Sequence, residues 1–307
     1  EIMPRYEKMC SLIGQPVKYR EVHMTATTNK AADVLAQATG RPCSTIHSFL
    51  GLKVTDDFST GTGRLTKTGN WMVRDRIILF VDEASMEDLR LLTFIREAML
   101  DCKVVHVGDH CQLAPVKETA PPVFLQGLPM YVLSEPMRNS GQPALMDICQ
   151  QLRTTVETGI FKPIQIVPGV IDKLTDQQMI TELSTDFVDP SFNGRILAYS
   201  NTRVLQYNDF IRHDIRQLPA EFSPGERLIN NTAFQWNKSQ ISVEEEVAIA
   251  DVAPTTSFME IEPGVSLEYR LCTLLTNFGH FPGVMIPVDR NHYSKLIKYY
   301  TKKKDWQ

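Results

Sequence analysis

Two acidic side chains directly follow an apolar run of strand length. Residues 78–85 read "ILFVDEAS", so Asp82 and Glu83 come at the end of the run. A buried parallel strand presents such residues at the carboxyl edge of its sheet. There one carboxylate can hold Mg²⁺ and the next can polarise an attacking water, as in nucleotide hydrolases. A capped helix start after the strand would explain the same two residues, and the motif alone leaves both explanations open.

Two further segments place polar side chains after apolar runs. "VVHVGDHCQLAPV" (residues 104–116) is a second buried strand that ends at residues 108–109, and Gln112 follows three residues later. A neutral amide there can contact a γ-phosphate or the attacking water without adding charge, although a polar strand-to-loop turn needs no such role. In "YVLSEPMRN" (residues 131–139), Arg138 follows a short predicted strand and could reach a nucleotide from a domain edge. A surface salt bridge would also account for a lone arginine.

A near match to a phosphate loop lies in residues 61–68, which read "GTGRLTKT". Thr66 stands where the pattern G-x-x-x-x-G-K-[ST] requires its second glycine. A phosphate loop needs a buried strand before it and a helix after it, so that backbone N–H groups converge on phosphate. The flanking segments "KVTDDFS" and "GNWMVRD" provide neither. The glycines among threonines instead predict a β-hairpin, over about residues 53–73.

Bulk composition restricts the class of protein. The chain has 307 residues, a net charge of −4 and 43% hydrophobic residues, which is enough for two or three domains and excludes a uniformly basic nucleic-acid coat. The six cysteines form no C-x-x-C pair, so the sequence indicates neither a zinc site nor a disulfide framework. It also shows no signal peptide and no apolar run of spanning length. We therefore expect a soluble cytoplasmic protein with no membrane contact.

The predicted elements place these motifs on an α/β scaffold. Strand and helix patterns alternate to about residue 130, as in a doubly wound domain. A second α/β unit follows, with a predicted strand in "GRILAYS" (residues 194–200). From about Phe222 short alternating strands predict a small β-domain, and a basic, aromatic-rich helix ends the chain. The chain opens on a helix that such a domain would precede with a strand, so we expect its first strand to be missing from this sequence.

The motifs together resemble those of superfamily 1 helicases, and specifically the superfamily 1B Pif1/RecD/Dda-like group of DNA helicases. Their order and spacing match, and the resemblance covers nearly the whole chain. The matching segments, in order, are "VHMTATTNKAADVL" (motif Ia), "STIHSFLGL", "VDEAS" (motif II), "GDHCQLAPV" (motif III), "LSEPMRN" (motif IV) and "AYSNTRVLQYN".

The resemblance implies an α/β fold of two RecA-like, P-loop NTPase-type parallel-sheet domains, with an inserted β-hairpin and a small SH3-like β-domain. The implied domains are residues 1–130 and 131–220, both incomplete RecA-like domains, and residues 221–307 with the basic helix. The implied cofactors are ATP and Mg²⁺. Asp82 and Glu83 would hold the metal, with Glu83 polarising water. Asp82, Gln112 and Arg138 would contact the bound nucleotide, and all four side chains are the implied catalytic set.

The same resemblance implies 5′→3′ translocation on single-stranded DNA and unwinding of fork duplex DNA, in replication, recombination or repair. We expect a monomer that works with replication proteins. The implied DNA contacts use small donors, which suit phosphate oxygens without reading sequence. They are Thr27, Thr28, Asn29, Thr45, His47, Asn201 and Thr202. For His47, a structural role in the core or in a cap is the alternative.

Two departures from the family pattern leave other functions open. The family's phosphate loop precedes motif Ia and its motifs V and VI follow the β-domain, and neither is found in this sequence. Residues 1–307 alone are therefore expected to be inactive as an ATPase. One alternative is a nucleic-acid-binding module that has the helicase fold without the motor, and another is an RNA-directed superfamily 1 helicase. The carboxylates at Asp82 and Glu83, with Gln112 and Arg138, favour the motor.

Overall fold

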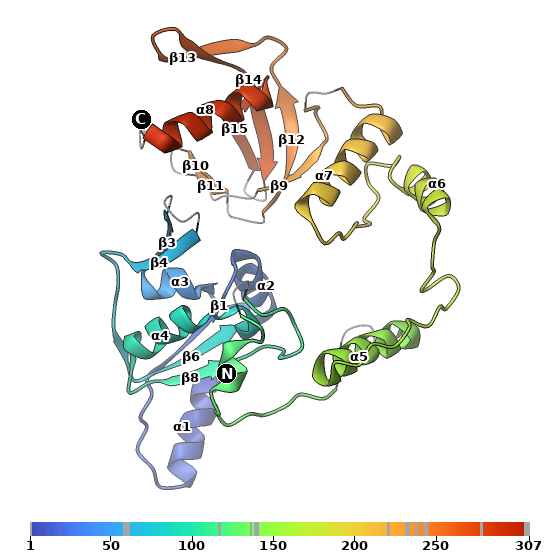
Figure 1. The fold of residues 1–307 in the computed structure, drawn as a ribbon. Helices are drawn as coiled ribbons and strands as arrows, with labels where there is room; N and C mark the ends of the chain where they lie inside the picture. The colour runs from blue at the N-terminus through green and yellow to red at the C-terminus, as the bar shows by residue number, and fades with distance from the viewer. Residues whose placement is uncertain are drawn as a thin grey trace. The chain divides into compact units, whose positions relative to one another are not determined.

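The chain separates into two compact units, Glu1–Ile171 and Asp172–Gln307. A computed structural model (Figure 1) describes residues 2–57, 62–115, 118–135, 137, 141–219, 222–230, 234–236, 239–241, 245–276 and 279–303. Within those residues no helix combines the length and the apolar character that crossing a bilayer requires. All six cysteines are free thiols.

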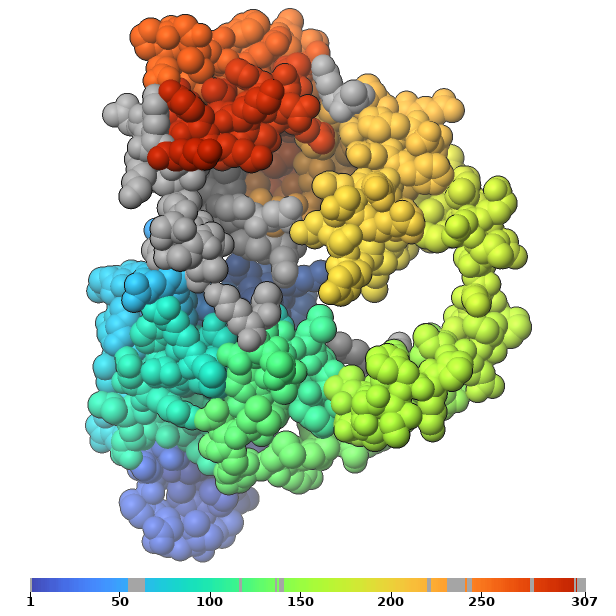
Figure 2. Space-filling view, viewed as in Figure 1, coloured from blue at the N-terminus to red at the C-terminus, as the bar shows by residue number. Residues whose placement is uncertain are grey.

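The first unit consists of short strands that alternate with helices, and it carries motifs Ia, II and III. Figure 2 shows its first helix, in blue at the bottom of the view, at the surface. In chain order the elements are α1 (Ile2–Leu12), β1 (Glu21–Ala26), α2 (Asn29–Thr39), β2 (Ser44–Thr45), α3 (Ile46–Leu50), β3 (Leu52–Asp57), β4 (Thr62–Lys67), β5 (Arg74–Asp75), β6 (Ile77–Asp82), η1 (Ala84–Met86), α4 (Leu89–Ala98), β7 (Met99–Leu100), β8 (Lys103–His106), η2 (Pro122–Leu125) and α5 (Pro143–Thr158).

A four-stranded parallel sheet organises this unit, in the order β2-β1-β6-β8. The strand β6 lies between β1 and β8, and Leu79 and Val81 on it are fully buried. Because a central parallel strand is covered on both faces, its sequence is a continuous apolar run. Leu91 and Ile95 of α4 pack against this strand in the core. The parallel α/β fold predicted from the apolar runs is confirmed.

Local capping sets the limits of the helices beside the sheet. Thr28 accepts a hydrogen bond from Ala31 N at 3.2 Å and so caps α2, which ends at Gly40 with φ 64°. Asp88 accepts one from Leu91 N at 2.7 Å and caps α4. Each cap satisfies an N–H group that the first turn of a helix leaves unpaired. The caps thereby fix where the chain turns back toward the sheet.

The near match to a phosphate loop forms a strand. Residues 62–67 are β4, which pairs antiparallel with β3, so no helix follows the glycines and no phosphate cradle can form there. Lys67 Nζ lies 2.6 Å from Glu97 Oε2 and 4.1 Å from the centre of the Trp71 ring. Trp71 in turn packs edge-on against Phe94 with ring centres 5.7 Å apart. Lys67 therefore packs on the outside of the hydrophobic core of the first unit. Residues 58–61, which include the first residue of the near match, lie outside the described residues.

Two strands predicted for the middle of the chain were wrong. Residues 131–134 and 195–199 are not in strands, and the described part of residues 131–220 forms helices and an isolated bridge between Val167 and Ile171. A strand is stable only when a neighbour accepts and donates its backbone hydrogen bonds. Leu133 and Leu197 in these segments instead stay exposed, at 84% and 92%. The second parallel sheet expected for residues 131–220 is thus not formed by the described residues, while the domain limits remain a prediction.

The second unit combines helices with an antiparallel sheet, which has the order β13-β14-β12-β9 with β15 paired to β14. Its core contains Ile249, Cys272 and Phe281, and burial raises the pKa of the Cys272 thiol to about 11. The SH3-like character of this sheet remains a prediction. The elements are α6 (Asp176–Asp186), α7 (Asn201–Asp209), the π-helix η3 (Phe210–Ile215), β9 (Arg227–Ile229), β10 (Phe234–Trp236), β11 (Ser239–Ile241), β12 (Glu246–Val252), β13 (Ser257–Glu262), β14 (Val265–Thr276), β15 (Gly279–Pro287) and α8 (Arg290–Lys303).

Substitution of Lys67 tests whether residues 61–68 bind phosphate. We expect Lys67→Ala to leave ATP affinity within about twofold of wild type, because the ammonium contacts Glu97 and Trp71. The lost contact with the indole should cost about 0.5–1 kcal/mol of stability. The measurements are fluorescent-nucleotide binding and thermal unfolding. Lys53→Ala, at an exposed position on the paired strand β3, is the matched control. A collapse of nucleotide binding in Lys67→Ala alone would return the phosphate loop to this segment.

Candidate functional site

The carboxyl ends of three parallel strands meet at one edge of the first sheet. Ala26, the last residue of β1, pairs with Asp82, the last residue of β6. On the other side of β6, Val81 pairs with His106 at the end of β8. The residues that follow each strand therefore emerge along a single edge, which is where open parallel sheets bind ligands. Three predicted groups meet there, namely the segments after β1, β6 and β8.

Asp82 and Glu83 sit in a sharp turn at this edge. Glu83 has φ 55° and ψ 41°, a left-handed conformation that a non-glycine residue adopts only at an energetic cost. The Glu83 N–H donates to Asp82 Oδ1 at 2.9 Å. Thr27 secures the turn from β1, because its N–H donates to Asp82 O and its hydroxyl donates to Glu83 O, both at 3.3 Å. Both acidic residues are half-buried, and the strained turn that carries them is held to the end of β1 by these hydrogen bonds.

Motifs II and III are joined through their backbones. Val107 N donates to Val81 O at 2.8 Å, and Ala84 N donates to Val107 O at 2.9 Å. At Gly108 the chain comes so close to η1 that an added Cβ would lie 3.0 Å from Ala84 N and 3.1 Å from Ser85 N. Only glycine tolerates such an approach without moving backbone. The relative position of the carboxylates and the motif III loop is therefore fixed by main-chain contacts.

A buried acid–imidazole pair lies behind this edge. Glu87 is fully buried, and His106 Nδ1 lies 2.8 Å from its Oε2. Burial raises the pKa of Glu87, while the contact with His106 opposes that rise. The pair ties the turn after Glu83 to β8. Sequence reasoning missed it, although a histidine within the apolar "VVHV" strand and an acid beside "EASM" were the available signals.

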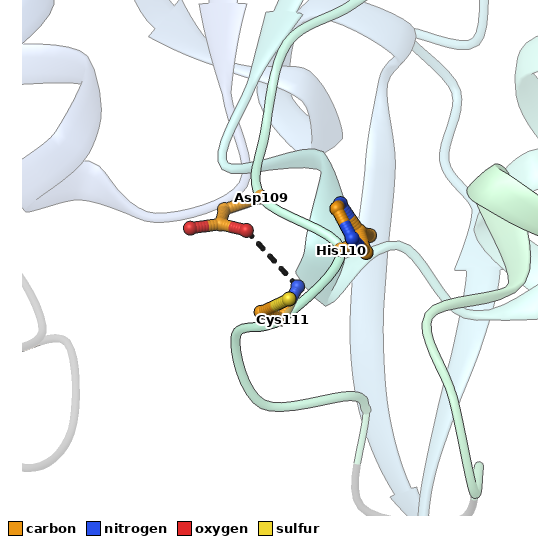
Figure 3. Close-up of side chains that lie close together, drawn as sticks. All are labelled: Asp109, His110 and Cys111. Atoms are coloured by element: carbon orange, nitrogen blue, oxygen red, sulfur yellow. Dashed lines mark hydrogen bonds between the residues drawn. The ribbon is translucent and has the colours of Figure 1, made fainter. Parts of the chain in front are cut away.

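Gln112 lies at the end of a tight turn after β8. Its N–H donates to Asp109 O at 3.1 Å, and Cys111 N donates to Asp109 Oδ1 at 3.0 Å. Figure 3 shows the side chains of Asp109, His110 and Cys111 along this loop. Their potential metal-ligating atoms all lie within 4.8 Å of one another. Gln112 itself is exposed, as an amide that contacts an external ligand must be.

The predicted DNA contacts of the first unit lie near the same edge but carry structural roles too. The hydroxyls of Thr28 and Thr45 accept hydrogen bonds from Ala31 N and Ser48 N, and so cap α2 and α3. Each hydroxyl oxygen accepts one of these hydrogen bonds, and its proton remains able to donate to a phosphate oxygen. Burial lowers the pKa of His47 against the opposing charge of Asp88. Burial therefore favours a neutral imidazole, which agrees with the alternative that His47 has a structural role in the core or in a cap.

The remaining predicted residues lie in different units. Asn29 begins α2 in the first unit, whereas Asn201 and Thr202 begin α7 in the second unit, where both are exposed and follow the capping residue Ser200. Arg138 lies outside the described residues. The first unit thus assembles Asp82, Glu83, Gln112, the Thr27–Asn29 segment and the Thr45–His47 segment. The roles of all predicted site residues stay predictions.

Comparisons with known proteins agree with the motif pattern. A family model described as an AAA domain matches residues 7–184. The ATP-dependent DNA helicase dda of Enterobacteria phage T4 is 22% identical over 222 residues, which are 67% of this chain and 48% of the phage protein. The chain thus spans about half the length of that relative. The predicted resemblance to the Pif1/RecD/Dda-like group is confirmed.

Solved structures of Pif1 helicases were also matched. One is the Bacteroides enzyme in complex with ADP-AlF3 and ssDNA, with a TM-score of 0.39 and 12% identity, covering 92% of this chain and 78% of that one. Another is a structure described as the basis for DNA unwinding at forked dsDNA by two coordinating Pif1 helicases, with a TM-score of 0.36 and 12% identity. That match covers 91% of this chain and 72% of the Pif1 chain.

The close approach at Gly108 generates a prediction. We expect Gly108→Ala to destabilise the first unit by about 1–3 kcal/mol, because the new methyl group meets backbone atoms that cannot rotate away. Chemical denaturation measures the effect. Gly69→Ala is the matched control, since a Cβ there has no heavy atom within 4 Å. Equal stability of the two variants would mean that motifs II and III are not in contact at this point.

Proposed function

The chain belongs to the AAA-domain family, and from that premise we propose that it provides the nucleotide-hydrolysing part of an ATP-dependent DNA helicase. The observation that carries the proposal is the fixed juxtaposition of Asp82 and Glu83 with the loop that ends at Gln112. These are an acidic pair and a neutral amide at the carboxyl edge of a parallel sheet. That combination suits a metal-bound triphosphate, whose hydrolysis requires charge neutralisation and an oriented water.

The acidic pair fits a magnesium–nucleotide complex. Mg²⁺ commonly uses one or two carboxylates, with waters and substrate phosphates completing its coordination. When bound, the ion would neutralise charge that develops on the phosphates. Asp82 would hold it, and Glu83 would accept a proton from the attacking water. Thr27 donates to the backbone carbonyl of Glu83, so the turn that carries the carboxylate is held before substrate arrives, which lowers the cost of reaching the transition state.

Gln112 and Arg138 would act on the γ-phosphate. The exposed amide of Gln112 would contact it from the motif III loop, and Arg138 would stabilise the transferred charge. Loss of that phosphate would remove both contacts. The resulting difference in affinity between triphosphate and diphosphate states is what allows a motor to change conformation during its cycle.

The DNA substrate and the direction of movement form the finer part of the proposal. The phage relative is named as a DNA helicase, and the Thr27–Asn29 and Thr45–His47 segments lie after β1 and beside β2 at the same edge. We propose that they hold the backbone of single-stranded DNA, with Asn201 and Thr202 doing so from the second unit, and that movement is 5′→3′. Replication, recombination and repair are the processes that such a motor would serve.

The antiparallel β3–β4 pair is proposed as the element that separates duplex strands. Trp71 is not suited to stacking on a base pair, because its ring packs on Phe94 and under Lys67. The part of the segment that would meet the fork includes Phe58, outside the described residues. A role in strand separation predicts that shortening residues 59–66 impairs unwinding more than DNA-stimulated ATP hydrolysis.

A second candidate is a nucleic-acid-binding module without a motor. The near match to a phosphate loop in residues 61–68 includes the strand β4, so Lys67 is not proposed as the lysine that holds the β- and γ-phosphates. Such a module would bind single-stranded DNA with an affinity that is independent of nucleotide. A motor would show different DNA affinities with a triphosphate analogue and with ADP.

Substitution of Glu83 separates a motor from a binding module. In the complete protein, Glu83→Gln should lower the turnover number for ATP at least about 100-fold and leave ATP affinity within about threefold. The reason is that a general base stabilises the transition state far more than the ground state. Steady-state hydrolysis and nucleotide binding are measured on the same preparation. Glu97→Gln on α4 is the matched control and should behave as wild type.

Two outcomes would contradict this assignment. Equal loss of ATP binding and turnover in Glu83→Gln would make Glu83 structural, in keeping with its strained backbone. Unchanged turnover would remove it from the chemistry altogether. Stimulation of hydrolysis by RNA in place of DNA would favour the RNA-directed alternative.

A further inference from the structure

Two side chains one turn apart on α5 contact the loop that follows β8. Arg153 Nη1 donates to Asp109 Oδ2 at 2.8 Å. Glu157 Oε1 lies 3.3 Å from His110 Nε2 and 3.6 Å from Cys111 Sγ, which donates to it. Arg153 Nε also lies 3.9 Å from Glu157 Oε1. Arg153 and Glu157, here called the α5 clamp, therefore contact all three consecutive residues of the loop.

The same loop sets the position of Gln112. Asp109 accepts Cys111 N with Oδ1 and Arg153 with Oδ2, and its carbonyl accepts Gln112 N. A continuous chain of hydrogen bonds thus runs from Arg153 through Asp109 to the backbone of Gln112. A carboxylate that accepts main-chain N–H groups defines the turn around it. Whatever moves Arg153 must also move or release the turn that presents Gln112.

The charges of the loop are matched by the clamp without a metal ion. The Arg153 hydrogen bond lowers the pKa of Asp109, and the Asp109 hydrogen bond raises the pKa of Arg153, so both groups favour the ion pair. Burial raises the pKa of Cys111, which favours the neutral thiol over the thiolate that metals prefer. A cation among Asp109, His110 and Cys111 (Figure 3) would also meet the guanidinium already 2.8 Å from Asp109. The cluster is therefore better explained by the clamp.

An ordinary surface ion pair is the simpler explanation to exclude. Isolated exposed pairs contribute about 0–1 kcal/mol and need have no role. This one differs because its side chains are about two-thirds covered, with 33% of Arg153 and 32% of Asp109 exposed. It also joins elements 44 residues apart and shares its carboxylate with the backbone of the loop. Networks with such additional partners are the ones in which ion pairs have structural consequences.

We propose that Arg153 and Glu157 are positioning residues, which hold the loop of residues 109–112 so that Gln112 faces the nucleotide, and which link that loop to α5. The proposal rests on the proposed ATP hydrolysis. The clamp thereby connects α5 to Gln112, the residue proposed to contact the γ-phosphate from the motif III loop. Opening of the clamp would release the turn that presents Gln112.

Hydrogen exchange tests the clamp independently of catalysis. In the complete protein, Arg153→Ala should speed millisecond-timescale exchange at the amides of Cys111 and Gln112 by about tenfold, because both amides bond to Asp109. Arg153→Lys, which retains one charged donor, should fall between Arg153→Ala and wild type. Glu157→Gln should speed alkylation of the Cys111 thiol, since the carboxylate that binds it loses its charge. Arg90→Ala on α4, an exposed arginine of the same unit, is the control and should leave each rate unchanged.

Kinetics then test positioning. Arg153→Ala should lower the turnover number for ATP about tenfold, with KM changed less than about threefold. Adding Asp109→Asn to Arg153→Ala should lower the turnover number little further, because both substitutions break the same ion pair. Unchanged exchange at Cys111 and Gln112 in Arg153→Ala would overturn the clamp. Faster exchange with unchanged turnover would overturn its positioning role. Absence of ATP hydrolysis in the complete wild-type protein would instead contradict the proposed function, and exchange would still decide whether the clamp exists.

Discussion

The contact between Gly108 and the backbone of η1 constrains the whole first unit. A side chain on Gly108, two residues after β8, would force the backbone of Ala84 and Ser85 to shift, and the hydrogen bond from Ala84 N to Val107 O holds the two segments together. Because β6 and β8 are neighbours in the sheet, this contact carries the acidic pair and the motif III loop to adjacent positions. A larger distance between Gly108 and η1 would separate Asp82 from Gln112 without altering either side chain. The chemistry proposed for the site thus depends on a steric limit in the main chain.

Around that contact the structure adds supports of two kinds. The buried Glu87–His106 pair lies behind the edge and ties the turn after β6 to β8, while Thr27 holds the turn from β1. On the exposed side, Arg153 and Glu157 of α5 hold the loop after β8. The Glu87–His106 pair is confined because packed surroundings cover both side chains. The outer support consists of half-exposed side chains on a separate helix, which makes it the part able to open.

The sequence was sufficient to predict those features that depend on interactions between residues close together in the chain. The apolar run before Asp82 predicted a central parallel strand, and the polar flanks of residues 61–68 correctly argued against a phosphate loop. Contacts between distant segments left no such signal. Glu87 and His106 are 19 residues apart, and Asp109 and Arg153 are 44 apart. The strands expected at residues 131–134 and 195–199 failed for a related reason, since apolar alternation gives strand propensity but does not supply a pairing partner.

Metal–nucleotide binding tests the central claim most directly. Electron paramagnetic resonance of Mn²⁺ with ATP, titrated with the complete protein, reports formation of the ternary complex, in which Mn²⁺ replaces Mg²⁺. The account predicts that Asp82→Asn weakens that complex at least about tenfold, while Asp75→Asn, at an exposed carboxylate on β5, binds as wild type. Equal binding by wild type and Asp82→Asn would contradict it, because the acidic pair at the edge of the sheet would then have no part in holding the nucleotide.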